Sequence, residues 1–326
     1  MQEPLVSINC ITYNHEKFIR QTLDGFIMQQ TDFPFEVIIH DDVSTDHTTD
    51  IIREYEEKYP DIIKPIYQTE NQFSKGIAMI PTFTYPQSKG KYVATCEGDD
   101  YWTDPLKLQK QVDFLDTHPE CSICFHPVKK IYDDGSKPDE FFPSSEYRFY
   151  KAVLSLDDLV QRGFMATNSV MYRRMLDTKE LLNDFPKNIL FGDWWLHILH
   201  AEKGLIGYID EIMGVYRKHS GGIAWQIEED RPEHSRKYGF KTLEFYRCID
   251  KHLNYHYTEP FTAMATNFAE NMIIAFLKHN EYNQIKKLRD EYRKYYLSAR
   301  PLVIKRIISA PERYIRHTLR FRLGRK

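Results

Sequence analysis

The first half of the chain alternates strand and helix patterns, and this alternation constrains its fold more than any other feature. Short apolar runs typical of β-strands occupy residues 5–11, 35–39, 62–67 and 91–96. Segments with apolar residues at helical spacing separate the first three runs. Such repetition implies right-handed crossovers, so it predicts an α/β fold with a mostly parallel central sheet flanked by helices.

Polar segments follow three of these predicted strands. They are Thr12-Tyr13-Asn14, Asp41-Asp42 and Glu97-Gly98-Asp99-Asp100. Ligands of open parallel sheets bind at the carboxyl ends of the strands. We therefore expect the three segments to line one crevice.

The acidic segment after the fourth strand is the strongest local signal. Carboxylates gathered at one strand end repel one another unless a cation or hydrogen bonds compensate them. Hard oxygen ligands of this kind suit Mg²⁺ or Mn²⁺ held jointly with substrate phosphates. The alternative is a solvated acidic turn that caps the next helix.

The other two segments suit a nucleoside. Asp41 or Asp42 can accept a hydrogen bond from a base N–H, and the adjoining loop can hold a ribose. Tyr13 can stack on a base, although a loop tyrosine is also often a packing residue. Asn14 is a candidate helix cap.

Together these residues resemble the family-two inverting glycosyltransferases with the GT-A fold. The matching segments are Val6-Ser7-Ile8 through Thr12-Tyr13-Asn14, Val37-Ile38-Ile39-His40-Asp41-Asp42-Val43-Ser44-Thr45-Asp46, and Gly90-Lys91-Tyr92-Val93 through Asp99-Asp100. The resemblance covers residues 4–130 well and extends less tightly to residue 222.

The resemblance implies transfer of a sugar from a nucleotide-diphosphate donor, with Mg²⁺ or Mn²⁺ as cofactor. Thr12 and Tyr13 would line the nucleoside pocket, and Asp42 would contact the base. Asp99 and Asp100 match the acidic metal-binding motif, with Asp100 as the direct ligand. The predicted nucleotide site also includes Asn14, Asp41 and Asp99. Because Glu97-Gly98 departs from the usual motif, it stays open whether Glu97 joins the metal shell.

The resemblance also implies a general base at the start of a helix on the acceptor side. Asp193, in Phe191-Gly192-Asp193-Trp194-Trp195, matches that position, and Trp194 and Trp195 can form an apolar wall for an acceptor sugar. The alternative is that Asp193 only caps its helix. A helix N-terminus lowers a carboxylate pKa, so burial would have to offset this effect in a base.

A basic loop, residues 216–222, follows the last predicted strand. We expect Arg217 or His219 to contact the diphosphate or the metal, as in a loop that closes over phosphates. A solvated loop between two domains is the alternative. We place a GT-A-like catalytic domain at residues 1–225 and a helical region at residues 226–326.

The end of the chain, residues 301–326, interleaves basic and apolar residues. A basic amphipathic segment can lie on an anionic membrane, which would suit a lipid-linked acceptor. A terminal helix packed on the body of the protein is equally compatible with the pattern. Surface polysaccharide or glycoconjugate assembly, on a glycan or lipid-linked acceptor, is the setting that the resemblance implies.

Composition excludes several other classes of protein. The formal net charge of −3 argues against a general nucleic-acid binder. No apolar stretch is long enough to predict a membrane span, and no signal peptide is evident. Five cysteines, mostly in apolar runs, suit a reducing compartment, so we expect a cytoplasmic protein. Cys121 and Cys124 fit a buried strand better than a redox pair or half of a zinc site.

Two rival functions remain open. A sugar-phosphate nucleotidyltransferase usually has a glycine-rich loop after its first strand, where this chain has residues 12–16. A non-catalytic nucleotide-sugar-binding scaffold would bind a donor without transferring its sugar. A dinucleotide oxidoreductase is disfavoured, because no Gly-x-Gly-x-x-Gly motif follows a strand.

Overall fold

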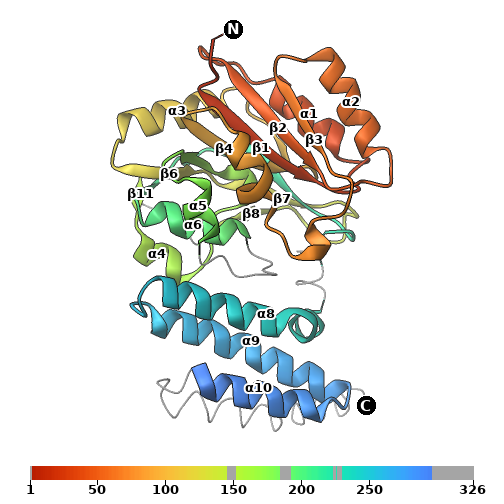
Figure 1. The fold of residues 1–326 in the computed structure, drawn as a ribbon, viewed down its shortest axis with the longest axis vertical. Coiled ribbons are helices and arrows are strands. Elements are labelled where there is room, and N and C mark those ends of the chain that lie inside the picture. The colour runs from red at the N-terminus through yellow and green to blue at the C-terminus, as the bar shows by residue number, and fades with distance from the viewer. Residues whose placement is uncertain (1, 145–151, 184–191, 223–224, 226–229, 296–326) are drawn as a thin grey trace. The chain divides into compact units, whose positions relative to one another are not determined.

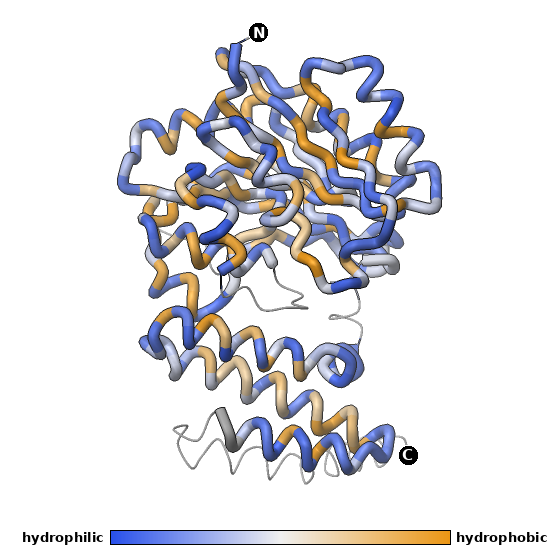
Figure 2. The backbone as a smooth tube through the Cα atoms, in the orientation of Figure 1, coloured by the Kyte–Doolittle hydropathy of each residue, from blue (hydrophilic) through white to orange (hydrophobic). Residues whose placement is uncertain are grey.

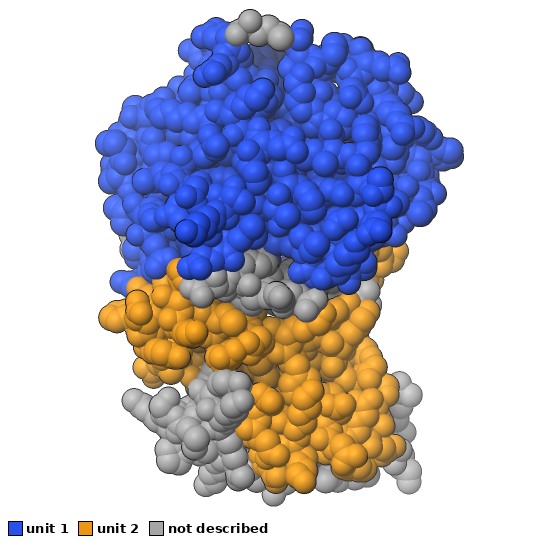
Figure 3. Space-filling view, in the orientation of Figure 1, with its two compact units in different colours: residues 1–219 blue, residues 220–326 orange. Residues whose placement is uncertain are grey.

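The computed structural model describes residues 2–144, 152–183, 192–222, 225 and 230–295. The chain divides into two compact units, Met1–His219 and Ser220–Lys326, which Figure 3 shows in different colours. The predicted domain boundary after residue 225 borders residues outside the described ranges and stays a prediction. The predicted membrane-binding tail, residues 301–326, also lies outside the described residues.

An eight-stranded sheet forms the centre of the first unit (Figure 1). Its order is β3-β2-β1-β4-β10-β6-β11-β9. The strands are β1 (Val6–Thr12), β2 (Phe35–Asp41), β3 (Ile63–Tyr67), β4 (Tyr92–Glu97), β6 (Cys121–Phe125), β9 (Val153–Leu154), β10 (Met171–Arg173) and β11 (Leu205–Tyr208). β3, β2, β1 and β4 run parallel, and β10 runs antiparallel to β4 and β6. The predicted α/β fold is confirmed.

Six α-helices in the described part of this unit connect or cover these strands. They are α1 (Ile19–Ile27), α2 (Thr48–Lys58), α3 (Lys107–Thr117), α4 (Leu156–Gln161), α5 (Thr178–Leu182) and α6 (Gly192–Ala201). Leu23, Ile52 and Leu108, from α1, α2 and α3, share one core with the apolar residues of β1, β2 and β4. Figure 2 shows this apolar character along the central strands. Each fully buried aliphatic side chain contributes about 1.5–3 kcal/mol, so the core fixes the strand ends rigidly.

A second sheet of four strands has the order β5-β12-β7-β8. Its strands are β5 (Tyr101–Trp102), β7 (Val128–Tyr132), β8 (Glu140–Phe142) and β12 (Gly214–Lys218). β7 and β8 pair antiparallel and form a hairpin. β6 and β7 are separate strands, because β6 ends before Pro127, whose nitrogen carries no hydrogen for a strand ladder.

The cysteines of β6 are buried, as the sequence predicts. Burial raises the pKa of the Cys121 thiol to about 11 and that of the Cys124 thiol to about 12. Both thiols are free. They therefore pack as small apolar side chains.

The described part of the second unit is helical. It contains α8 (Arg231–His252), α9 (Thr258–Lys278) and α10 (Tyr282–Tyr295). Asp230 caps α8 by accepting a hydrogen bond from the backbone nitrogen of Glu233, and Pro232 occupies its first turn. Across the described residues, none of the helices has the length and hydropathy needed to cross a bilayer.

Candidate functional site

The carboxyl ends of β1, β2 and β4 lie side by side at one edge of the large sheet (Figure 1). Thr12 on β1 pairs with Asp41 on β2, and Ile11 pairs with Glu97 on β4. Just beyond the strands, the backbone nitrogen of Asp42 donates to the carbonyl oxygen of Thr12 at 3.1 Å. The sheet thus brings the beginnings of all three predicted polar segments to the same edge.

Asp41 and Asp42 are buried, and each carboxylate fixes a loop. Asp41 Oδ1 accepts hydrogen bonds from the hydroxyl of Ser44 at 2.6 Å and from its backbone nitrogen at 3.1 Å. Asp42 accepts from the backbone nitrogens of Gln72 at 2.7 Å and Phe73 at 3.0 Å. Contact of either carboxylate with a nucleobase stays a prediction. In the structure, the two carboxylates hold the neighbouring loops in place by hydrogen bonds.

The loop after β1 has one exposed aromatic residue and one structural asparagine. Tyr13 is 45% exposed and offers an accessible ring. Asn14 has a left-handed backbone (φ 55°), and its side-chain oxygen accepts a hydrogen bond from the backbone nitrogen of Thr45 at 2.7 Å. The predicted helix cap at Asn14 is wrong, because α1 begins only at Ile19. Asn14 instead fastens the first loop to the loop after β2.

His15, Asp99 and His219 form a candidate metal centre. Within the described ranges they are the single group of three or more His, Cys, Asp or Glu side chains arranged to hold one ion, with ligand atoms that lie within 4.8 Å of one another. His219 Nε2 lies 3.0 Å from Asp99 Oδ2, and His15 Nε2 lies 3.8 Å from the same oxygen. Two imidazoles and one carboxylate are a suitable ligand set for a divalent cation.

The ionisation of this cluster also suits a cation. Burial opposes ionisation of Asp99, but the hydrogen bond with His219 and the charges of His15 and His219 outweigh burial and lower the pKa of Asp99. Burial lowers the pKa of His15, against the opposing charge of Asp99. An ionised carboxylate and a neutral imidazole are the forms that bind metals.

Asp100, the predicted direct metal ligand, is only 1% exposed. Its Oδ1 accepts a hydrogen bond from the backbone nitrogen of Arg217 at 2.8 Å, and its Oδ2 has no partner within the described residues. Burial, with the charges of Asp99 and Glu97, raises the pKa of Asp100. The structure thus gives Asp100 a structural contact with β12, and its predicted role as a ligand stays untested.

Arg217 ties β12 to the acidic turn. Its guanidinium donates to the carbonyl oxygen of Asp99 at 2.8 Å and to the side-chain oxygen of Gln21 at 2.6 Å. It also lies 4.5 Å from the ring centroid of Phe18 and 5.0 Å from that of Tyr101. These contacts hold the guanidinium within the protein, so its predicted contact with a diphosphate would require some of them to change.

Asp193 lies in the first turn of α6, as predicted. Its Oδ1 accepts a hydrogen bond from the backbone nitrogen of Trp194 at 2.8 Å, and its Oδ2 accepts from the hydroxyl of Thr167 at 3.2 Å. Burial raises the pKa of Asp193, and these two hydrogen bonds oppose that rise. A carboxylate with a raised pKa is a better proton acceptor near neutral pH.

The two tryptophans after Asp193 differ in exposure. Trp195 is buried, and its indole nitrogen donates to the carbonyl oxygen of Leu181 at 3.3 Å. Trp194 is half-buried. Because Trp195 has no exposed surface, Trp194 is the better candidate of the two for an acceptor contact.

Glu97 links the acidic turn to Asp193. Burial, together with the charges of Asp99 and Asp193, raises the pKa of Glu97 to about 8, and Lys218 opposes the rise. Asp99 and Asp193 therefore act on the same carboxyl group from different elements. The candidate metal centre and the candidate base share one electrostatic environment.

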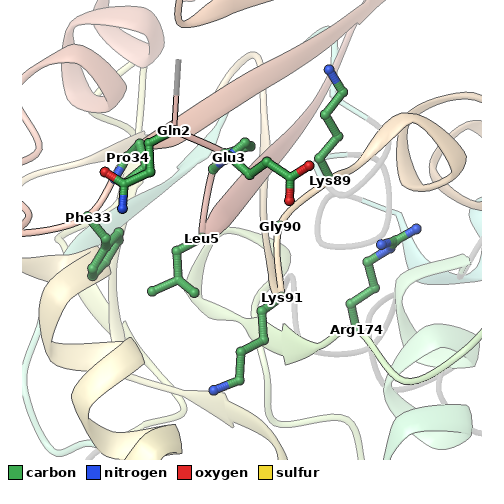
Figure 4. Close-up of a pocket in the computed structure, with 10 residues that line it drawn as sticks. Gln2, Glu3, Leu5, Phe33, Pro34, Lys89, Gly90, Lys91 and Arg174 are labelled. Carbon is green, nitrogen blue, oxygen red and sulfur yellow. The ribbon is translucent and has the colours of Figure 1, made fainter.

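A surface pocket lies elsewhere in the first unit (Figure 4). Its lining includes Leu5, Pro34 and Gly90, which precede β1, β2 and β4. Lys89 and Arg174 add positive charge to it. This pocket borders the amino ends of the parallel strands, and the candidate site lies at their carboxyl ends.

Two residues of this site were missed by the sequence reasoning. His15 follows the predicted nucleoside loop, and its position directly after Asn14 was the available signal. Thr167 lies in a single helical turn, Thr167–Ser169, which precedes the short strand β10. Thr167 and Asp193 are distant in sequence, and only the fold brings them into contact. No local sequence pattern predicts this contact.

The chain shows clear similarity to known proteins. Residues 7–179 match the family described as glycosyl transferase family 2. The Mycobacterium tuberculosis protein Rv1520 is 48% identical over 69% of this chain, and the match spans 62% of that relative's length. The Escherichia coli enzyme WfaP, a UDP-Glc:α-D-GlcNAc-diphosphoundecaprenol β-1,3-glucosyltransferase, is 35% identical over 68% of this chain and 80% of its own.

Solved structures share the fold. Staphylococcus aureus TarS 1–349, in a complex with UDP-GlcNAc, superposes with a TM-score of 0.55 at 20% identity and covers 98% of this chain and 92% of its own. This likeness concerns the fold, which agrees with the GT-A expectation. From the family match and the relatives, we conclude that the chain belongs to glycosyl transferase family 2.

Proposed function

We propose that this glycosyltransferase moves a sugar from a nucleotide-diphosphate donor to an acceptor hydroxyl by a single displacement that inverts the anomeric configuration. One observation carries the proposal: hydrogen bonds join β4, which ends beside Asp99, to Asp193 of α6. The hydroxyl of Thr95 on β4 donates to the carbonyl oxygen of Thr167 at 2.7 Å, and the hydroxyl of Thr167 donates to Asp193 at 3.2 Å. A donor-binding group and a candidate base in one environment are what a single displacement requires.

The donor half of the site suits a nucleotide. The exposed ring of Tyr13 offers a stacking surface for a base. The carboxylate of Asp42 orders the loop that contains Gln72 and Phe73, and the backbone nitrogen of Asp42 donates to the carbonyl oxygen of Thr12, the residue before Tyr13. The relative WfaP has a UDP-sugar in its name, which supports a nucleotide-sugar donor for this chain too.

The ligand set of His15, Asp99 and His219 fits a divalent cation, and the family resemblance implies Mg²⁺ or Mn²⁺. Such an ion supplies charge neutralisation to a departing diphosphate. Arg217 braces the same turn through the carbonyl oxygen of Asp99, so the turn is held in shape before a donor arrives. Asp100, whose Oδ1 accepts a hydrogen bond from the backbone nitrogen of Arg217, remains a predicted further ligand.

Asp193 is the proposed general base. It takes the acceptor proton while the acceptor oxygen attacks the anomeric carbon from the face opposite the nucleotide. The pKa of Asp193, raised by burial, favours this role near neutral pH. Thr167 and the backbone nitrogen of Trp194 hold its two oxygens, and Trp194 offers a wall for the acceptor.

The acceptor is proposed to be a glycan or a lipid-linked glycan in surface polysaccharide assembly. The name of WfaP describes an acceptor of the second kind, and the match covers 80% of its length. A cytoplasmic location, with contact to the membrane surface through residues 301–326, belongs to the same proposal.

Donor binding and transfer can be tested separately. Thermal shifts with UDP-, GDP-, CDP- and dTDP-sugars, with and without Mn²⁺, identify the donor, since a ligand that binds the folded state raises its melting temperature. Asp193→Asn should leave donor stabilisation intact and lower acceptor-dependent release of nucleoside diphosphate by about 10²–10⁴-fold. Asp113→Asn, at an exposed position on α3, is the matched control.

Three outcomes would contradict the proposal. Release of pyrophosphate from a nucleoside triphosphate would indicate a nucleotidyltransferase. Donor binding without any transfer or hydrolysis would indicate a binding scaffold. Full transfer activity in Asp193→Asn would remove Asp193 as the base.

A further inference from the structure

We propose that His15 is a metal ligand alongside Asp99 and His219, and that the pair of imidazoles makes this site select first-row transition ions such as Mn²⁺ or Co²⁺ over Mg²⁺. This inference rests on the proposed function, because it names the class of cofactor for the same site. It concerns a residue that follows the nucleoside loop and lies outside the acidic segment.

The backbone and ring of His15 are both held in place. Its backbone nitrogen donates to the hydroxyl of Thr48 at 2.8 Å, and its Nδ1 lies 3.1 Å from the hydroxyl of Thr12. When Nδ1 carries the proton and donates to Thr12, the lone pair of Nε2 is left for a metal. Metal-binding histidines are commonly oriented in this way by a partner on the second ring nitrogen.

Gly98 provides the space for this arrangement. A Cβ atom at position 98 would lie 2.5 Å from Thr12 Oγ1, 2.7 Å from Thr12 Cβ and 3.0 Å from His15 Nδ1. Any side chain here would therefore push Thr12 and His15 away from the acidic turn. The glycine before Asp99, a departure from the family's usual motif, is explained by the approach of His15.

The distances suit a shared ion. Ligands bound at about 2.1 Å and at right angles lie about 3.0 Å apart. The observed separations from Asp99 Oδ2 are 3.0 Å to His219 Nε2 and 3.8 Å to His15 Nε2. All three ligand atoms lie within 4.8 Å of one another, so an inward movement of His15 would bring them onto one ion.

The chemistry of the ligands favours a transition ion. Mg²⁺ prefers oxygen ligands and keeps much of its water shell, so two imidazoles add little to its binding. Affinity of nitrogen ligands for divalent ions rises from Mn²⁺ through Co²⁺ along the first transition row. Two imidazole nitrogens should therefore widen the gap between these ions and Mg²⁺.

Binding of Mn²⁺ alone to the full-length protein tests the proposal without an activity assay. Pulsed electron paramagnetic resonance of bound Mn²⁺ should detect nitrogen from two imidazoles in the wild type and from one in His15→Ala. Calorimetric Mn²⁺ affinity should fall about 10-fold or more in His15→Ala, and Mg²⁺ affinity should fall less. Gly98→Ala should weaken Mn²⁺ in the same direction, because it displaces His15.

The matched control is His47→Ala. His47 is exposed and lies 3.1 Å from Asp50, so it offers a histidine–aspartate pair that belongs to no three-ligand group in the described ranges. Its removal should leave Mn²⁺ affinity unchanged. Circular dichroism of each metal-free variant checks folding, and Gly98→Ala serves as the second variant if His15→Ala does not fold.

Nitrogen from one imidazole in the wild type, or a spectrum unchanged by His15→Ala, would overturn the proposal. So would equal affinities for Mn²⁺ and Mg²⁺. These results differ from failure of the proposed function, in which Mn²⁺ is bound through both histidines but no sugar is transferred.

Discussion

Acidification should destabilise the first unit through two buried histidines of α6. His197 is 2% exposed and His200 is fully buried. His197 Nδ1 lies 2.8 Å from the hydroxyl of Tyr172, and His200 Nδ1 lies 2.8 Å from the carbonyl oxygen of Leu196. Burial lowers the pKa of His197 to about 3 and that of His200 to about 4.

The size of the effect follows from proton linkage. The unfolded chain takes up a proton at each histidine as the pH falls below about 6.5, and the folded chain resists it until pH 3–4. Stability contributed by the neutral histidines is therefore present above pH 6.5 and is lost as the pH falls. Between about pH 7.5 and 5, each histidine should cost about 2 kcal/mol, or about 4 kcal/mol together.

Urea unfolding at both pH values measures this loss directly. His197→Leu should reduce the acid-dependent loss by about 2 kcal/mol, although removing the hydrogen bond between His197 and the Tyr172 hydroxyl also costs about 1–3 kcal/mol at every pH. The exposed residue His47, changed to Leu, should leave the pH dependence in place. If His197→Leu lost stability with acid as steeply as the wild type, the account of a neutral buried histidine would be refuted.

Three other predictions concern the site and the core. Thr167→Val should lower kcat and move the acidic limb of the rate profile to higher pH. The hydrogen bond from Thr167 lowers the pKa of Asp193, so its removal raises that pKa. Thr167→Ser should restore both kcat and the limb, and a limb that does not move in Thr167→Val would contradict the contact. The other ionisable groups around Asp193 are Glu97, Tyr172 and Tyr216, and neither variant changes them. Gly90→Ala would place a Cβ 2.6 Å from the backbone nitrogen of Ser7, so urea unfolding should show that the free energy of unfolding falls by about 1–3 kcal/mol. Gly163→Ala is the control, because the space around Gly163 is open and the free energy of unfolding should hardly change. Burial lowers the pKa of Lys107 to about 7. Between about pH 7 and 9 the free energy of unfolding of the wild type should therefore rise by about 2 kcal/mol relative to that of Lys107→Met. Equal dependence of the two free energies on pH would contradict this.

The parallel half of the sheet was predictable because its signals are local. The apolar runs of β1 to β4 and the helical spacing between the first three of them predict parallel strands joined by right-handed crossovers. The order β3-β2-β1-β4 comes from the structure. The strand-end positions of Asp42 and Asp99 followed from the same rule. The antiparallel insertion of β10 beside β4 was not predictable, because nothing local to residues 171–173 specifies a partner about 80 residues away.

The composition of the candidate site was only partly predictable for the same reason. His15 meets Asp99 through a loop contact that also requires Gly98. His15 follows β1, whereas Gly98 and Asp99 follow β4. The separate roles of Trp194 and Trp195 could have been inferred, since Trp195 shares helical spacing with Ile198 and Leu199, and all three are buried. Arg217 was assigned to the diphosphate from its charge, and only the fold shows its contacts with Gln21 and Asp99.

The central claim is that this site transfers a sugar by one displacement, with Asp193 as the base. The most direct measurement is nuclear magnetic resonance of the anomeric proton in the product formed from an α-linked nucleotide-sugar, by wild type and by Asp193→Asn. The account predicts a β-linked product from the wild type and almost none from the variant. An α-linked product, or equal product from both proteins, would contradict it.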